Sequence, residues 1–203
     1  MHEDEKGHQF SRRGVLATAS LVPLAALNTT AAPAEQPNFS APQLQLIEAF
    51  VDRLIPTDEN GPGARESGVQ VYIDHCFAGY LSAQKAAFIA GLEAVDALAQ
   101  SRHKVSFAQL DAAQRDELLT VMERNEVPGF ERGSRAFLYR VRQLTLEGMF
   151  GDPFYGGNRD FAGWDLIRYP GPRMAVSPDD QRIKEPIKPL RVSARGGAQH
   201  HGG

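Results

Sequence analysis

The sequence SAPQLQLIEAFVDRLIP, residues 40–56, predicts an amphipathic helix. Ser40 can cap the first turn, Pro42 suits that turn, and Gln43 can return a bond to the cap. Apolar residues then recur three or four positions apart, which is the spacing of a helix and not of a strand. Pro56 ends the run. We expect this apolar face to lie in a core.

Several segments further along the chain also have apolar residues at helical spacing. Capping and apolar spacing predict helices over residues 69–80, about 82–102, about 111–123 and 131–149. No segment alternates with period two in a composition typical of strands. The expected fold is therefore all-α, an irregular bundle of about five helices with a loop-rich C-terminal segment. In the helix over residues 69–80, the expected core-facing residues are Ile73, Cys76, Phe77 and Tyr80.

The linker TDENGPGARESG, residues 57–68, contains acidic residues that raise the question of calcium. It lacks the alternating oxygen ligands and the final bidentate glutamate of a calcium-binding helix–loop–helix. Its glycines and proline instead predict a tight turn.

The N-terminal residues 1–34 have the order of an export signal, in which a charged start precedes an apolar stretch and small residues. Arg12 and Arg13 resemble the pair of a twin-arginine signal, although Val15 and Ala17 depart from the usual pattern. The other interpretation is an amphipathic helix with a chance arginine pair. We expect recognition by the twin-arginine translocase. The small residues offer a cleavage position after Ala32 and another after Ala34, and the sequence does not choose between them or specify whether the signal is removed.

The composition and the motifs of the sequence do not indicate a catalytic or cofactor-binding function for this chain. A net charge of −3 argues against a nucleic-acid partner. No apolar run approaches the roughly 20 residues of a spanning helix. Gly-x-Gly-x-x-Gly after a strand, Cys-x-x-Cys-His and paired metal-binding histidines are all missing. His75 and Cys76 are neighbours on a helix and point in different directions. We expect no catalytic, cofactor-binding or metal-binding residue here.

Cys76 is the only cysteine, so a disulfide within the chain is impossible. One interpretation makes it a small buried apolar residue. The other makes it one half of a disulfide with a partner subunit, because a leftover cysteine in an exported protein can pair between chains.

The segment from Tyr155 to Trp164 joins aromatic residues to turn residues and allows two interpretations. It folds back over the bundle, or it forms a docking surface for another protein. In the second case, exposed Tyr155 and Trp164 provide contact area, because both residue types are enriched in interface hot spots. Gly156 and Gly157 permit close backbone approach, and Asn158 completes the candidate interface.

The composition after residue 175 changes to charge, proline and glycine. We expect the helical domain to span residues 35–175 and residues 176–203 to form a tail that is disordered until bound. Its lysines and arginines either dock on an acidic partner surface or stay solvated.

Two separated groups of motifs resemble one known family. FVDRLIP (residues 50–56), GPGA (61–64) and VYID (71–74) are similar to the N-terminal half of the gluconate 2-dehydrogenase subunit 3 family. EGMFGDPFYGGN (147–158) and FAGWDLIRYPG (161–171) resemble its C-terminal half. The similarity spans about residues 40–173.

The resemblance implies the non-catalytic small subunit of a three-part periplasmic dehydrogenase. A large subunit would hold FAD and oxidise gluconate or a related polyol or sugar, and a multihaem cytochrome c subunit would carry the electrons onward through haem c. The small subunit would serve assembly and export of the flavoprotein, and would reach the inner membrane through its partners. Two alternatives stay open: a transient export chaperone or binding module that leaves the mature complex, and a free-standing periplasmic enzyme.

Overall fold

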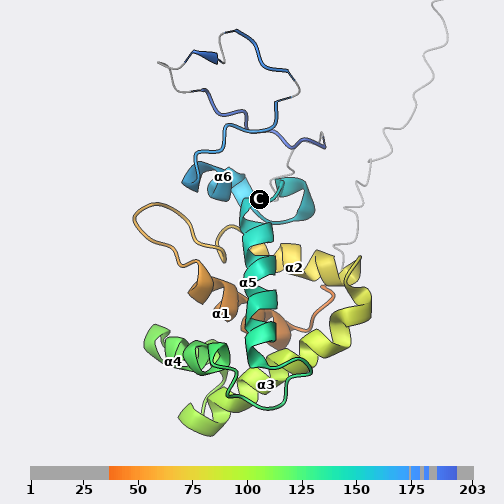
Figure 1. Cartoon of the computed structure of the whole chain (residues 1–203), viewed down its shortest axis with the longest axis vertical. Coiled ribbons are helices and arrows are strands. Elements are labelled where there is room, and N and C mark those ends of the chain that lie inside the picture. Colours follow the sequence, from red (N-terminus) through yellow and green to blue (C-terminus); the bar gives the residue numbers. More distant parts are fainter. Residues whose placement is uncertain (1–36, 174, 179–180, 183–186, 196–203) are drawn as a thin grey trace, which may run out of the picture. The chain divides into compact units, whose positions relative to one another are not determined.

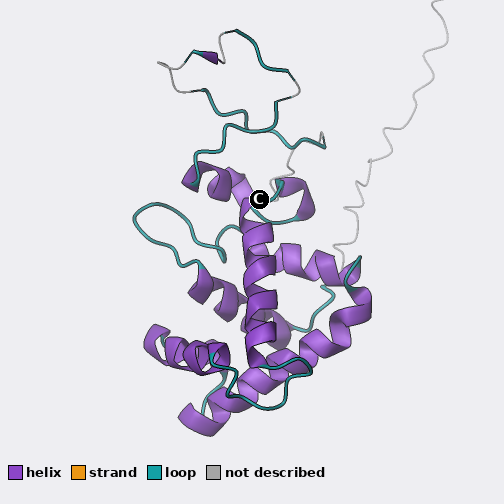
Figure 2. Ribbon diagram, in the orientation of Figure 1, coloured by secondary structure: helices purple, strands orange, loops and turns teal. Residues whose placement is uncertain are grey.

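The computed structural model describes residues 37–173, 175–178, 181–182 and 187–195. The expected export signal, with Arg12 and Arg13, lies outside these residues. The described chain has six α-helices and no strand, which confirms the all-α fold class (Figures 1 and 2). The helices are α1 (Ala41–Leu54), α2 (Val69–Ala78), α3 (Lys85–His103), α4 (Ala112–Glu123), α5 (Ser134–Phe150) and α6 (Ala162–Leu166). Four 3-10 turns connect them: η1 (Ser82–Gln84), η2 (Phe107–Gln109), η3 (Pro153–Tyr155) and η4 (Arg159–Phe161).

The predicted helix starts form through local contacts. The Ser40 N–H donates to Gln43 Oε1 at 3.0 Å at the start of α1. At α4, the Asp111 side chain accepts from the Gln114 N–H at 2.8 Å, and the Gln114 side chain accepts from the Asp111 N–H at 3.2 Å. These bonds satisfy N–H groups that have no partner inside the helix. Both helices therefore begin where the sequence predicts. None of the described helices combines the length and apolarity needed to cross a membrane.

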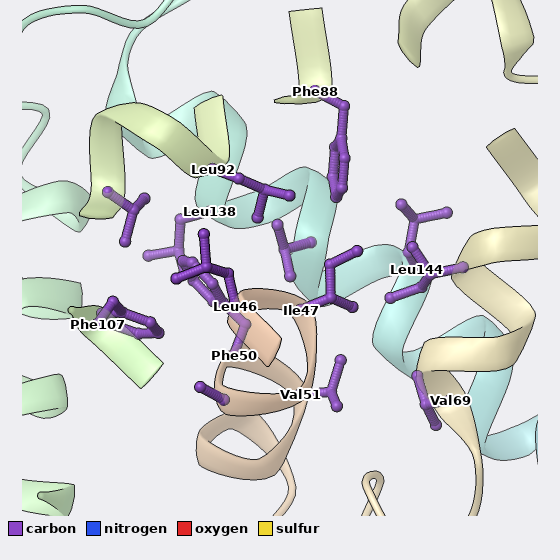
Figure 3. Packing of buried hydrophobic residues seen from close by; sticks show 14 of the residues in the cluster. Leu46, Ile47, Phe50, Val51, Val69, Phe88, Leu92, Phe107, Leu138 and Leu144 are labelled. Carbon is purple, nitrogen blue, oxygen red and sulfur yellow. The ribbon is translucent and has the colours of Figure 1, made fainter. Parts of the chain in front are cut away.

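Helix α5 is the central element of the bundle. It contacts α1, α2, α3, α4 and α6, and Figure 1 shows the first four arranged along it. Its inward face is apolar and meets the apolar faces of α1 and α3 (Figure 3). Each large apolar side chain that is fully buried there stabilises the fold by about 1.5–3 kcal/mol. The buried residues of α5 that build this core are Leu138, Val141, Leu144 and Met149.

Phenylalanine rings connect elements that are far apart in the sequence. The ring centroids of Phe50 in α1 and Phe107 in η2 are 4.7 Å apart. Phe77 in α2 and Phe88 in α3 are 4.4 Å apart, and Phe39 packs edge-on against Phe77 at 5.4 Å. Such tilted and edge-on arrangements are those that aromatic pairs favour. The rings therefore tie the chain before α1 to α2 and α3.

The first described residues are held by one carboxylate. Asp74 in α2 accepts hydrogen bonds from the backbone N–H groups of Asn38 and Phe39, both at 2.9 Å. The Lys85 ammonium donates to Asn38 Oδ1 at 2.7 Å and lies 5.8 Å from the Phe39 ring centroid. The domain is thus anchored only a few residues after the expected cleavage region.

Two expectations about the helices need correction. Tyr80 is 70% exposed and does not face the core, because α2 ends at Ala78 and Gly79 turns the chain away from the helical path. The last long helix begins at Ser134 and not at residue 131, because Gly133 has a left-handed φ of 88° directly before it. The sequence also did not predict the short helix α6.

Candidate functional site

The segment after α5 folds back onto the end of that helix through Asn158. This residue is fully buried, its Nδ2 donates to the Gly151 carbonyl at 2.8 Å, and its Oδ1 accepts from the Gly163 N–H at 2.9 Å. Its φ of 48° is left-handed, a conformation that asparagine adopts more readily than most residues. Asn158 therefore closes the loop from within, and its side chain is not presented to a partner.

Small residues let this segment touch the backbone of α5. A Cβ added to Gly157 would collide with the Gly148 carbonyl oxygen, and one added to Gly163 would collide with that of Met149. Gly156 has a left-handed φ of 103°, and a Cβ there would lie 2.8 Å from His75 Nδ1. The glycines in this segment thus serve close packing within the chain.

Trp164 is buried, with 6% of the residue exposed. Its indole Nε1 donates to the Phe150 carbonyl at 3.0 Å, and its ring packs against Phe161 and Tyr169 at 5.3 and 4.9 Å. A buried indole needs such an acceptor, and the last carbonyls of a helix have no partner within it. Trp164 is therefore not exposed as the docking interpretation requires, and the part of the segment around it folds back over the bundle.

Of the five residues of the candidate interface, Tyr155 alone presents a large exposed side chain. It is 43% exposed, and its neighbour Phe154 is 55% exposed, with the two rings edge-on at 5.3 Å. Asp152 sets this geometry, because its Oδ1 accepts from the Phe154 N–H at 2.9 Å at the start of η3. Phe154 was not among the predicted interface residues, although it lies directly beside Tyr155 in the sequence.

The C-terminal segment, which we define as residues 187–195, is hydrogen-bonded to the folded-back segment that follows α5. The Leu190 N–H donates to the Pro170 carbonyl at 2.8 Å, and the Ala194 N–H donates to Asp152 Oδ2 at 2.8 Å. Contacts with the helical domain thus continue well past the expected boundary at residue 175.

Two arginines of the C-terminal segment add charge contacts. Arg191 pairs with Asp165 at 2.7 Å. The Arg195 guanidinium lies 5.6 Å from the Tyr155 ring centroid and 5.9 Å from that of Phe154, within the range of cation–π attraction. We call Asp152, Phe154, Tyr155 and Asp165 together the aromatic–acidic surface.

Cys76 lies in a separate buried cluster between α2 and α5. The residue is 4% exposed, and burial raises the pKa of its thiol. Burial also raises the pKa of Tyr72, whose hydroxyl donates to Glu147 Oε2 at 3.0 Å. A buried thiol that stays protonated is a poor nucleophile. The interpretation of Cys76 as a small buried residue describes this environment, and pairing with another chain would first require α2 to expose the sulfur.

A polar pocket of about 350 Å³ lies between α1 and η2, and its charges are compensated locally. Arg115 pairs with Asp52 at 3.3 Å and donates to the Ala108 carbonyl at 2.9 Å. In the part of the chain that the structure describes, no three His, Cys, Asp or Glu side chains are grouped as a metal site would require. The aromatic–acidic surface is therefore the stronger candidate for a functional site.

The sequence of the helical domain matches one known protein family. A family model described as gluconate 2-dehydrogenase subunit 3 covers residues 41–171, from the first residue of α1 to just beyond α6. The match includes the aromatic–acidic surface and stops short of both the expected signal and the C-terminal segment. Neither a curated protein nor a solved structure matches the chain.

Proposed function

Because the chain belongs to the gluconate 2-dehydrogenase subunit 3 family, we propose that it is the non-catalytic small subunit of a periplasmic FAD-dependent dehydrogenase for gluconate, a polyol or a sugar. A family named for a numbered subunit implies a complex of several chains. In this proposal the large subunit holds FAD and oxidises the substrate. A multihaem cytochrome c subunit accepts the electrons through haem c, and the present chain serves assembly and export.

The exposed pair Phe154 and Tyr155 carries the assembly role. Aromatic rings that stay exposed on a rigid support are typical of the hot spots at which proteins bind one another. The support here is built from Asn158 and Trp164, whose polar groups already have partners inside the chain. The candidate interface thus separates into Tyr155, with its neighbour Phe154, as contact residues and the remaining residues as their scaffold.

The export role rests on Arg12 and Arg13 in the N-terminal sequence. We propose that the twin-arginine translocase moves this chain together with the flavoprotein, and that the complex is bound to the inner membrane through its partners. The translocase carries folded cargo, and the Asp74 bonds that anchor the chain at Asn38 and Phe39 suit a domain that is folded before transport.

Co-isolation tests the proposal directly. The full-length chain, tagged at its C-terminus, is isolated from periplasm together with the dehydrogenase flavoprotein of the same organism. We expect a stable complex with wild type and at least a tenfold loss of flavoprotein with Phe154→Ala/Tyr155→Ala. The control is Tyr139→Ala, which removes a ring that is 51% exposed on α5. Melting temperatures of the purified chains show whether folding is intact.

The outcomes separate the candidates. If wild type carries no flavin-containing partner from periplasm but binds one in the cytoplasm, the chain is a transient chaperone. If the wild-type complex is stable and the double variant retains it fully, the aromatic pair is not the contact. Substrate oxidation by the lone wild-type chain would reject the non-catalytic role altogether.

A further inference from the structure

We propose that the aromatic–acidic surface, together with the adjoining residues 170–173, is a receptor for an arginine-bearing, non-helical protein segment. In the free chain, residues 187–195 occupy this receptor. On assembly, a segment of the same chemistry from the large subunit displaces them. The identity of the displacing partner rests on the proposed function above, whereas the receptor itself rests on the contacts of this chain.

The contacts form a pattern that repeats after four residues. At Leu190 a backbone N–H donates to the Pro170 carbonyl, and the next side chain, Arg191, pairs with Asp165. At Ala194 a backbone N–H donates to the Asp152 carboxylate. The next side chain, Arg195, lies over the rings of the neighbouring Phe154 and Tyr155. The receptor thus recognises two units, each an N–H followed by a guanidinium. Any segment that offers two arginines in this arrangement meets the same acceptors.

The receptor is shaped for close approach of a backbone. Gly171 has a left-handed φ of 86°, and a Cβ there would collide with the Leu190 carbonyl oxygen. Arg173 adds a hydrogen bond from its guanidinium to the Lys188 carbonyl at 2.6 Å. The segment is therefore seated by main-chain contacts at defined positions, which favours recognition of a backbone over contact with scattered charges.

The same segment is held in a way that allows exchange. Its apolar side chains Ile187, Leu190 and Val192 stay 42%, 42% and 47% exposed, so little apolar area is buried. The Arg191–Asp165 pair is also solvated, with side-chain exposures of 51% and 42%, and water and salt screen such pairs strongly. The C-terminal segment therefore occupies the receptor largely because it belongs to the same chain. The covalent connection keeps the segment at a high effective concentration near the receptor.

In this proposal the C-terminal segment has a function before assembly. The Phe154 and Tyr155 rings are partly covered by Arg195 until a partner arrives, which limits contacts between exposed rings of different copies. A partner segment must compete with the C-terminal segment of the same chain for the receptor. Partners that lack the two arginines are therefore disfavoured. The site also selects for guanidinium groups, because Asp165 pairs with the first of them and the Phe154 and Tyr155 rings attract the second.

The receptor is tested with the peptide IKPLRVSAR, the sequence of residues 187–195, added to full-length chains. In Arg191→Ala/Arg195→Ala the tethered segment is weakened, so we expect the peptide to bind this variant at least tenfold more tightly than wild type. Binding should weaken with rising salt, and should fall at least fivefold when Asp165→Asn is added. A peptide of the same composition in scrambled order is the matched control. Equal binding to wild type and variant, or equal binding of both peptides, would overturn the receptor.

Displacement is tested on the complex with the flavoprotein by hydrogen exchange. We expect the Leu190 and Ala194 amides to exchange at least tenfold faster in the complex than in the free chain, and Arg191→Ala/Arg195→Ala to bind the flavoprotein more tightly than wild type. Protection that persists in the complex, or a wild-type chain that dimerises by exchanging tails, would overturn displacement. If the peptide binds as expected but no flavoprotein associates with wild type, the receptor stands and the proposed function fails.

Discussion

The indole Nε1 of Trp164 donates a hydrogen bond to the backbone carbonyl of Phe150, 3.0 Å away, and so joins α6 to the last residue of α5. The two residues are fourteen positions apart in the sequence. The bond satisfies a carbonyl at a helix end, where intrahelical partners are missing. The aromatic–acidic surface is therefore supported from beneath by a buried aromatic residue.

Trp164→Ala should lower the free energy of unfolding by about 3–5 kcal/mol, the range for removing a large buried aromatic side chain. Trp164→Phe keeps most of the ring and loses the N–H, so its cost should be nearer to about 1–3 kcal/mol, because the Phe150 carbonyl is left without its partner. Urea unfolding of the purified full-length chain measures both. If Trp164→Ala unfolds at the same urea concentration as wild type, the indole does not support the fold.

Gly157 tests the packing of the folded-back segment against α5. Gly157→Ala should destabilise by about 1–3 kcal/mol, because the new Cβ meets the backbone carbonyl of Gly148, which cannot move aside as a side chain would. Gly157→Val should cost more, since a steric conflict grows with volume. Thermal unfolding of the three chains provides the comparison. A loss that does not increase from alanine to valine would contradict a steric cause.

Because the Cys76 thiol is buried, we expect the free energy of unfolding to fall at alkaline pH. Burial raises the pKa of Cys76 above its ordinary value of 9.0, so the native state keeps a proton that the unfolded chain releases. The stabilisation is fully present below about pH 9 and is lost as pH rises toward the native pKa, at up to about 1.4 kcal/mol per pH unit. Unfolding free energies of wild type and Cys76→Ala between pH 7 and pH 11 measure this difference. Parallel curves would show that the thiol does not contribute to the pH dependence.

Arg12→Lys combined with Arg13→Lys should leave both this chain and its flavoprotein in the cytoplasm, because the twin-arginine route depends on the arginine pair. Cell fractionation and dehydrogenase activity in the periplasm report the outcome. Arg142→Lys, an exposed position on α5, is the control for a change from arginine to lysine. Normal periplasmic activity in the double variant would count against the carrier role.

Helix positions were accessible from the order of residues because the contacts that start and stop a helix are local. Ser40 with Gln43 and Asp111 with Gln114 are three residues apart, and both pairs bond as expected. Helix α1 ends just before Pro56, because a proline inside a helix removes a hydrogen bond and clashes with the preceding turn. The motifs at residues 50–56, 61–64, 71–74, 147–158 and 161–171 also indicated the family that the family model confirms.

Which aromatic residues face solvent depended on contacts between distant parts of the chain. Trp164 is buried because α5 ends within reach of its N–H, while Tyr155 stays exposed because η3 turns its ring outward. Arg191 meets Asp165 across 26 positions. Local spacing specifies which residues share a helix face, but the burial of any one side chain is set by whatever else the fold brings against it. That is why the five longer helices could be located from the chain alone, whereas α6 and the surface that the helices support could not.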